Sequence, residues 1–112
     1  MPLKPIKIKH TLDKIKMDPK QALKAANNLI KGRWQKAEPY IMKDASAATD
    51  YATFVIKGAW KEAEPNIMKD ANYAVLYAIN VLHHRWLEGE PIIKKNSAAW
   101  KNYRNYFGIK KD

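Results

Sequence analysis

The sequence predicts an all-α protein, built from about four 26-residue repeats that stack into a compact α-solenoid-like array. Each repeat is expected to be a longer helix followed by a short one. Three observations lead to this fold. Residues 29–44 recur with few changes at 55–70 and more loosely at 81–96. Apolar residues within each unit return at the spacing of one helix face. Each of the first three units also carries a proline at the same place, namely Pro39, Pro65 and Pro91.

The chain is expected to form a single domain over residues 1–112, because this length supports one hydrophobic core. Hydrophobic residues make up 46% of it, which is typical of a globular protein, and it has no cysteine. Disulfides and thiolate metal sites are therefore excluded. The predicted parts are a basic N-terminal arm with a short helix over 1–17, then repeats over 18–43, 44–69, 70–95 and 96–112.

In chain order, the first predicted element is a short helix over residues 11–17, in which Leu12 and Ile15 are apolar. Asp18 and Pro19 then form a helix start, since aspartate caps a helix and proline suits its first position. The long helix that follows carries a stripe at Ala22, Ala25, Ala26, Leu29 and Ile30. Gly32 is expected to end this helix in the left-handed conformation.

The element after Gly32 must be short, because Pro39 lacks an N–H and is tolerated only in the first turn of a helix. It is expected over about residues 36–43. Asp44, Asp70 and Asn96 begin the next three repeats at the position of Asp18. The last long helix carries its stripe at Trp100, Tyr103 and Phe107, and ends at Gly108.

One tryptophan stands at the same position of each of the first three repeats: Trp34, Trp60 and Trp86. Two interpretations are open. The three rings could form a ladder on which nucleobases stack, one base per repeat. Alternatively, each ring fills the joint between a long helix and the next short one, and identical spacing favours this structural interpretation.

No residue set predicts catalysis, so the protein is expected to be non-enzymatic, with no cofactor and no metal. Glu38, Glu64 and Glu90 each precede a proline and have no second acid nearby for acid–base chemistry, which favours a structural role in binding free N–H groups at a helix start. His83 and His84 are adjacent, and neighbouring residues of a helix point in different directions, unlike the ligand spacing of metal sites.

The charge predicts a polyanionic partner. The chain has 21 Lys+Arg against 11 Asp+Glu, a net charge of +10, and residues 1–43 alone carry +8. Clustering at one end favours contact with nucleic acid, or with a nucleic-acid–protein complex, over a purely solubilising role. The residues predicted to contact phosphates are Lys4, Lys7, Lys9, Lys14, Lys16, Lys20, Lys24, Lys31, Arg33 and Lys36.

The third long helix predicts a different kind of partner. Val75, Leu76 and Ile79 add apolar side chains to its normal stripe, so it is apolar on nearly all sides. Such a helix is either covered twice within the fold or carries an interface. The alternative function is therefore a stoichiometric protein-binding factor or inhibitor of a host enzyme, or a homodimer.

A resemblance to a known group of repeats covers about residues 18–107. It is carried by Ile30-Lys31-Gly32-Arg33-Trp34, Ala37-Glu38-Pro39-Tyr40-Ile41-Met42-Lys43-Asp44 and Tyr51-Ala52. This pattern resembles tandem repeats of tailed-phage proteins, which run approximately G-R-W-P-E-A-E, then an isoleucine, an aspartate and a Y-A pair. The sequence departs from them at Gln35 and Lys61, where proline is usual, and at His84, where glycine is usual. The resemblance implies a viral protein that binds a host or viral machine, and implies no particular chemistry.

No membrane association is expected. No stretch of the sequence reaches the roughly 20 apolar residues that span a bilayer, and no apolar run follows the charged N-terminus as in a secretory signal. The expected location is the cytoplasm, which would be that of the host cell for a viral protein.

Overall fold

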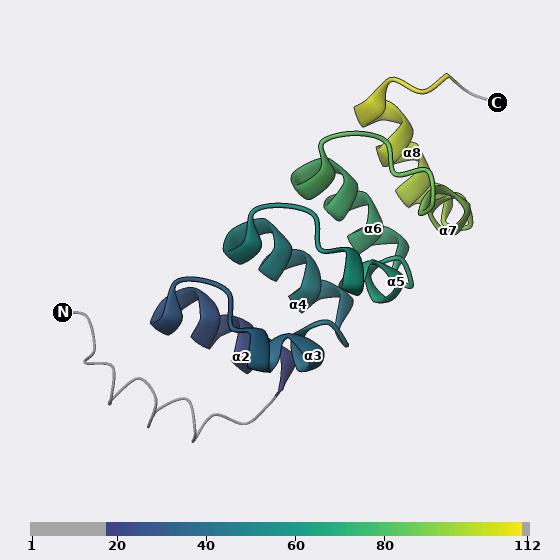
Figure 1. The fold of residues 1–112 in the computed structure, drawn as a ribbon. Helices are drawn as coiled ribbons and strands as arrows, with labels where there is room; N and C mark the ends of the chain where they lie inside the picture. The colour runs from purple at the N-terminus through teal and green to yellow at the C-terminus, as the bar shows by residue number, and fades with distance from the viewer. Residues whose placement is uncertain (1–17, 111–112) are drawn as a thin grey trace.

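The computed structural model describes residues 18–110, and every regular element within that range is helical, which confirms the all-α prediction. Long and short helices alternate along the chain with the predicted 26-residue period (Figure 1). The arm and short helix expected over residues 1–17 lie outside the described residues, and so do Lys4, Lys7, Lys9, Lys14 and Lys16.

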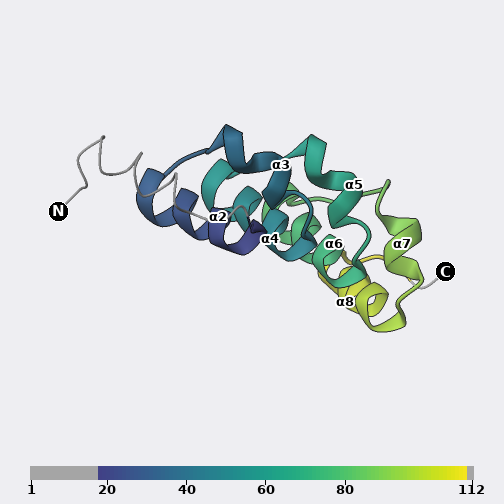
Figure 2. The ribbon, with the colours of Figure 1, turned by 90° about the horizontal axis from the view of Figure 1, so that it is seen from below.

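The long helices form one layer and lie side by side in chain order, while the short helices form a second layer on one side of them (Figure 2). The long helices are α2 (Pro19–Ala25) continued by Ala26–Ile30, α4 (Ala45–Asp50) continued by Tyr51–Ile56, α6 (Ala71–Tyr77) continued by Ala78–Leu82, and α8 (Ser97–Phe107). The short helices are α3 (Glu38–Ile41), α5 (Glu64–Ile67) and α7 (Glu90–Lys94), the first two preceded by the 3-10 turns Gln35–Ala37 and Lys61–Ala63.

Each long helix begins where the sequence predicts, at an aspartate or asparagine whose side chain binds free backbone N–H groups. Asp18 accepts from the Lys20 N–H at 2.8 Å, and Asp44 accepts from the Ala47 N–H at 2.8 Å. The same bonds recur at Asp70 and Asn96. These caps satisfy donors that have no partner within the helix, so they fix the start of every repeat.

The ends of the long helices differ from the prediction. The first three finish in π-helical turns, and the left-handed residue is Lys31 (φ 57°) rather than Gly32. Lys57 and His83 occupy the same conformation in the next two repeats. The π turn winds one extra residue before the helix stops, since the Lys57 N–H bonds to the carbonyl of Ala52, five residues back. In the last repeat Gly108 is left-handed, as expected.

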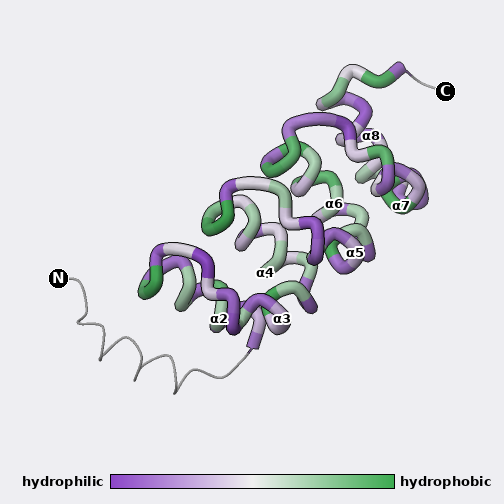
Figure 3. The backbone as a smooth tube through the Cα atoms, viewed as in Figure 1, coloured by the Kyte–Doolittle hydropathy of each residue, from purple (hydrophilic) through white to green (hydrophobic). Residues whose placement is uncertain are grey.

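The core lies between the two layers. Alanines such as Ala22, Ala48 and Ala74 on the long helices are fully buried, which allows neighbouring helices to approach closely. The largest fully buried side chains are Trp60, Tyr51, Tyr77, Tyr103, Ile41, Ile67 and Ile93. Hydrophobic positions also recur at the far ends of the first three long helices, next to the more polar connections that follow (Figure 3). The array measures 56 × 22 × 19 Å, so it is an elongated stack.

Candidate nucleic-acid interface

Each joint between repeats contains one buried tyrosine that binds two groups of the preceding connection. The Tyr51 hydroxyl accepts from the Trp34 backbone N–H at 2.8 Å and donates to the Glu38 carboxylate at 2.7 Å. Tyr77 binds Trp60 and Glu64 at the same two distances, and Tyr103 binds Trp86 and Glu90 likewise. The hydroxyl therefore gives the backbone N–H an acceptor and the buried carboxylate a donor.

Two of the three carboxylates also receive an arginine. Arg33 donates through Nε and an Nη atom to both oxygens of Glu38, at 2.8 Å each, and Arg85 binds Glu90 in the same bidentate way. These charged donors hold the pKa of Glu38 and of Glu90 below the usual value of 4.5, although burial acts in the opposite direction. Burial, followed by the hydrogen bond to the carboxylate, raises the pKa of Tyr51 to about 12.

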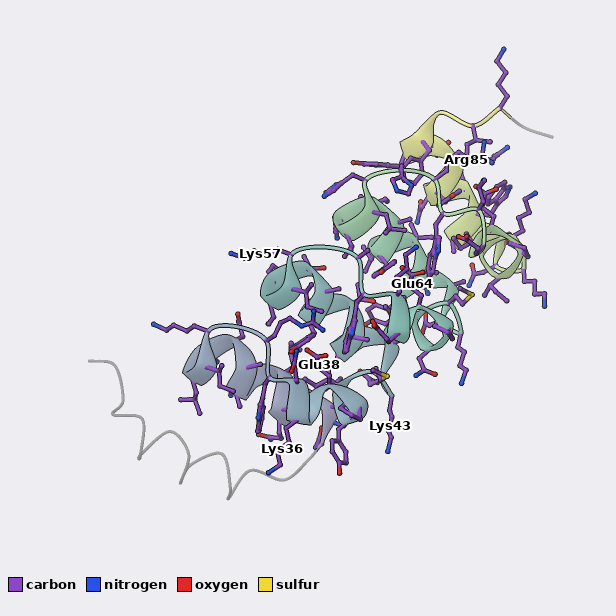
Figure 4. The ribbon with its side chains drawn as sticks, in the orientation of Figure 1. Lys36, Glu38, Lys43, Lys57, Glu64 and Arg85 are labelled. Carbon is purple, nitrogen blue, oxygen red and sulfur yellow. The ribbon has the colours of Figure 1, made fainter. Side chains whose placement is uncertain are left out.

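The middle joint lacks the arginine. Ala59 stands where the other two have Arg33 and Arg85, and among the described residues only the Tyr77 hydroxyl donates to Glu64. The pKa of Tyr77 is raised, first by burial and second by the hydrogen bond to Glu64. Figure 4 shows Glu38 and Glu64 directed into the array, away from the lysines at its edges.

These contacts decide the two open questions about the periodic residues. Trp60 and Trp86 are buried, and the Tyr51 and Tyr77 rings lie 4.9 Å from them, centroid to centroid, so these two tryptophans fill the joints. Trp34 is partly buried against the same core, so the three rings form no exposed ladder. The structural role of the glutamates is confirmed as well. Their donors in the described part of the chain, however, are tyrosine and arginine side chains, where backbone N–H groups were expected.

Four of the lysines predicted to contact nucleic acid lie within the described residues, and all four are exposed: Lys20, Lys24, Lys31 and Lys36. None of them forms an ion pair with a described carboxylate. Among these lysines, Lys20 interacts electrostatically with Asp50 and favours its ionised form. The pKa of Asp50 is nevertheless raised, first by burial and second by the charge of Asp44. Arg33 differs from the lysines, since its guanidinium is bound by Glu38 and its charge is offset there.

The structure brings one of these lysines, Lys31, and a lysine outside the predicted set, Lys57, next to an aromatic ring that the sequence did not single out. Phe54, near the end of the second long helix, is 60% exposed. It lines a cavity of about 270 Å³ between the ends of the first two long helices, together with Asn27, Lys31, Gly32, Val55 and Lys57. Lys57 extends from the edge of the array at which the long helices end, whereas Lys43 lies at the opposite edge (Figure 4).

Phe54 could have been noticed from the repeat alignment. Its equivalents are Asn28, Asn80 and Tyr106, so the register is polar or exposed in the other repeats and a phenylalanine there departs from the pattern. The pairing of Phe54 with Lys31 could not have been read from the sequence, because it depends on how the two helices lie side by side.

The residues predicted to form a protein interface separate into three environments. Val75 is buried at 6% exposure within the core, and Ile79 is partly buried against it. Leu76 is 42% exposed. Much of the extra apolar surface of the third long helix is therefore covered by the array itself, and Leu76 is its exposed part.

The fold and its repeated joint define the class of the molecule: it is a tandem helical-repeat protein. No family model, no curated protein and no solved structure matches the chain. No helix within residues 18–110 is long and apolar enough to cross a membrane. Nor does the described range bring together three His, Cys, Asp or Glu side chains that could hold a metal ion.

Proposed function

We propose that the protein is a non-enzymatic binding protein that engages nucleic acid, or a nucleic-acid–protein machine, through the basic surface of its first repeat. The observation that carries this proposal is the exposure of Lys20, Lys24, Lys31 and Lys36, none of which pairs with a carboxylate of residues 18–110. They lie on a segment with a net charge of +8 over residues 1–43. The resemblance of the repeats to those of tailed-phage proteins supports a viral origin.

Lysines of this kind bind phosphates by displacing condensed counterions, so affinity falls with salt in proportion to the number of phosphates contacted. Four duplex phosphate contacts correspond to a slope of about −3.6 in a plot of log affinity against log salt. Such contacts carry no base information, and we expect little sequence preference.

The test is fluorescence anisotropy of labelled DNA and RNA over a range of salt concentrations. The variant Lys24→Ala/Lys31→Ala is expected to bind more weakly and to flatten the slope by about 1.8, since two contacts are removed. Lys69→Ala/Lys95→Ala is the matched control, because both lysines are exposed and lie in later repeats. Absence of binding by the unmodified protein, or an equal loss in the two double variants, would contradict the proposal.

A second candidate is protein binding through the third long helix, favoured by the exposure of Leu76. Leu76→Lys should then abolish binding to a protein target, or convert a homodimer to a monomer in light scattering, without loss of helical circular dichroism. Affinity purification with and without nuclease separates the candidates, because a nucleic-acid-mediated complex is lost on digestion and a direct protein complex is retained.

A further inference from the structure

We infer that the cavity between the ends of the first two long helices binds an unstacked nucleotide of single-stranded nucleic acid, with Phe54 stacking on the base and Lys31 and Lys57 contacting the flanking phosphates. This inference rests on the proposed function and names the class of nucleic acid that the basic surface would take. Two properties of the cavity lead to it: an exposed ring and a pair of cations.

The ring is available for stacking. Phe54 is 60% exposed, so most of its surface lies outside the core and adds little to packing. Its position near the end of the long helix places it at the mouth of a cavity of about 270 Å³. That volume is close to the lower limit, roughly 300 Å³, of pockets that hold small ligands. An aromatic ring of this kind accepts any base, because every base has a π-face.

The cations flank the ring from two different repeats. Lys31 and Lys57 line the same cavity and occupy equivalent left-handed positions at the ends of successive long helices. Both are exposed, and neither has an ion pair with a described residue. Their backbone N–H groups bond to the carbonyls of Ala26 and Ala52, so phosphate contact falls to the ammonium groups.

Both lysines are the C-cap residues of long helices, where the negative end of the helix dipole favours a cation. The dipole supplies about half a charge, whereas each lysine carries a full one, so the cavity remains positive. A duplex keeps the faces of its bases covered by neighbouring bases. The combination of an exposed ring with two cations therefore fits a single strand better than a duplex.

The last repeat offers a matched control. Tyr106 stands in the register of Phe54 and is 59% exposed, but its neighbours in the equivalent positions are His83 and Ile109, where the cavity has Lys31 and Lys57. An aromatic side chain can thus be removed from the same helix position with the two lysines left intact.

The experiment measures binding of labelled oligothymidylate and of a duplex of equal length by fluorescence anisotropy, after circular dichroism shows that each variant is folded. The unmodified protein is expected to prefer the single strand. Phe54→Ala should weaken single-strand binding about tenfold and leave duplex binding unchanged. Phe54→Trp should preserve single-strand binding, and Tyr106→Ala should not alter it.

The outcomes separate this inference from the proposed function. Binding of neither oligonucleotide by the unmodified protein would overturn both. Nucleic-acid binding that is undiminished in Phe54→Ala, or that falls equally in Tyr106→Ala, would overturn the single-strand site and leave the basic surface standing. Loss of binding to a purified protein target in Phe54→Ala, with oligonucleotide binding unchanged, would assign the ring to a protein interface and overturn the inference as well.

Discussion

A tyrosine hydroxyl joins each repeat to the one before it, through bonds to residues 13 and 17 positions earlier in the chain. The tyrosine ring also packs on a tryptophan of the following connection in the first two joints. Tyr51 packs on Trp60, and Tyr77 packs on Trp86. One side chain therefore contacts two successive connections. Phenylalanine could supply the ring contact but would leave the tryptophan N–H and the carboxylate without their partner.

The middle joint offers a direct test of the arginine. We predict that Ala59→Arg restores the bidentate pair seen at Arg33–Glu38. It should raise the free energy of unfolding by up to about 1 kcal/mol, since the arginine of such a pair is 45% exposed and therefore screened by solvent. Urea denaturation measures the change. Ala59→Lys is the control, because a lysine provides the charge but cannot form the bidentate pair of hydrogen bonds. Equal gains from the two substitutions would mean that charge alone matters there.

Acid should destabilise the protein through the same carboxylates. The pKa values of Glu38 and Glu90 are lowered in the folded chain, so below about pH 4.5 the unfolded state binds more protons than the native state. The stability they contribute is complete above that pH and is lost as the pH falls through their folded pKa values. We predict this loss in urea midpoints measured across the range.

The comparison variant for the acid prediction is Arg33→Ala/Arg85→Ala. Without the arginines the two carboxyls lose the main cause of their lowered pKa, so the acid decline should become shallower. A decline of unchanged steepness would assign the pH dependence to other groups.

At the scale of elements, the last long helix ends one residue earlier than the first. The left-handed residue follows the N-cap by 13 positions in the first repeat, from Asp18 to Lys31, and by 12 in the last, from Asn96 to Gly108. The last repeat has Ile109 where the others have Lys31, Lys57 and His83. A β-branched residue is strained in this conformation and glycine is not, so the final helix stops one residue earlier and remains α-helical.

This arrangement predicts opposite effects for neighbouring substitutions. His83→Gly should raise the free energy of unfolding by up to about 1 kcal/mol, because it relieves a side chain from the left-handed region. Gly58→Ala should raise it by about 0.4–1 kcal/mol, since Gly58 lacks a positive φ and an added Cβ would meet no atom within 4 Å. Gly108→Ala should lower it, because Gly108 has a φ of 67°. Urea denaturation measures all three changes. Marked destabilisation by Gly58→Ala would mean that glycine, and not the left-handed residue before it, ends the helix.

At the scale of the whole molecule, the array is a one-dimensional stack. Its radius of gyration is 16.0 Å, whereas a compact domain of 100 residues has about 13 Å. Each long helix packs on its immediate neighbours, α2 on α4, α4 on α6 and α6 on α8. In such a stack stability is approximately a sum over repeats and the interfaces between them.

A stack of this kind should tolerate the loss of one whole period. Deletion of residues 44–69 joins Lys43 to Asp70 and brings Tyr77 into the place of Tyr51, opposite Glu38 and Trp34. We predict a folded, helical protein with a lower free energy of unfolding, as measured by circular dichroism and urea denaturation. Deletion of residues 44–65, which breaks the period by four residues, is expected to unfold the chain. Equal behaviour of the two deletions would contradict the periodic stack.

The repeat, the starts of the helices and the shortness of the second helix in each unit follow from the amino-acid sequence alone. These features are local: Asp18 caps the helix that begins beside it, Pro39 limits the helix that contains it, and the tryptophans return at a constant interval. The structural roles of Trp60 and Glu64 also followed from that interval.

The packing of the helices in the tertiary structure sets which side of each long helix is covered by the neighbouring repeats. A periodic pattern gives the spacing of residues on a helix but not the rotation at which adjacent helices pack, so Val75 is buried while Leu76, the next residue, is exposed. For the same reason the cavity shared by Lys31, Phe54 and Lys57 exists only after two repeats are stacked.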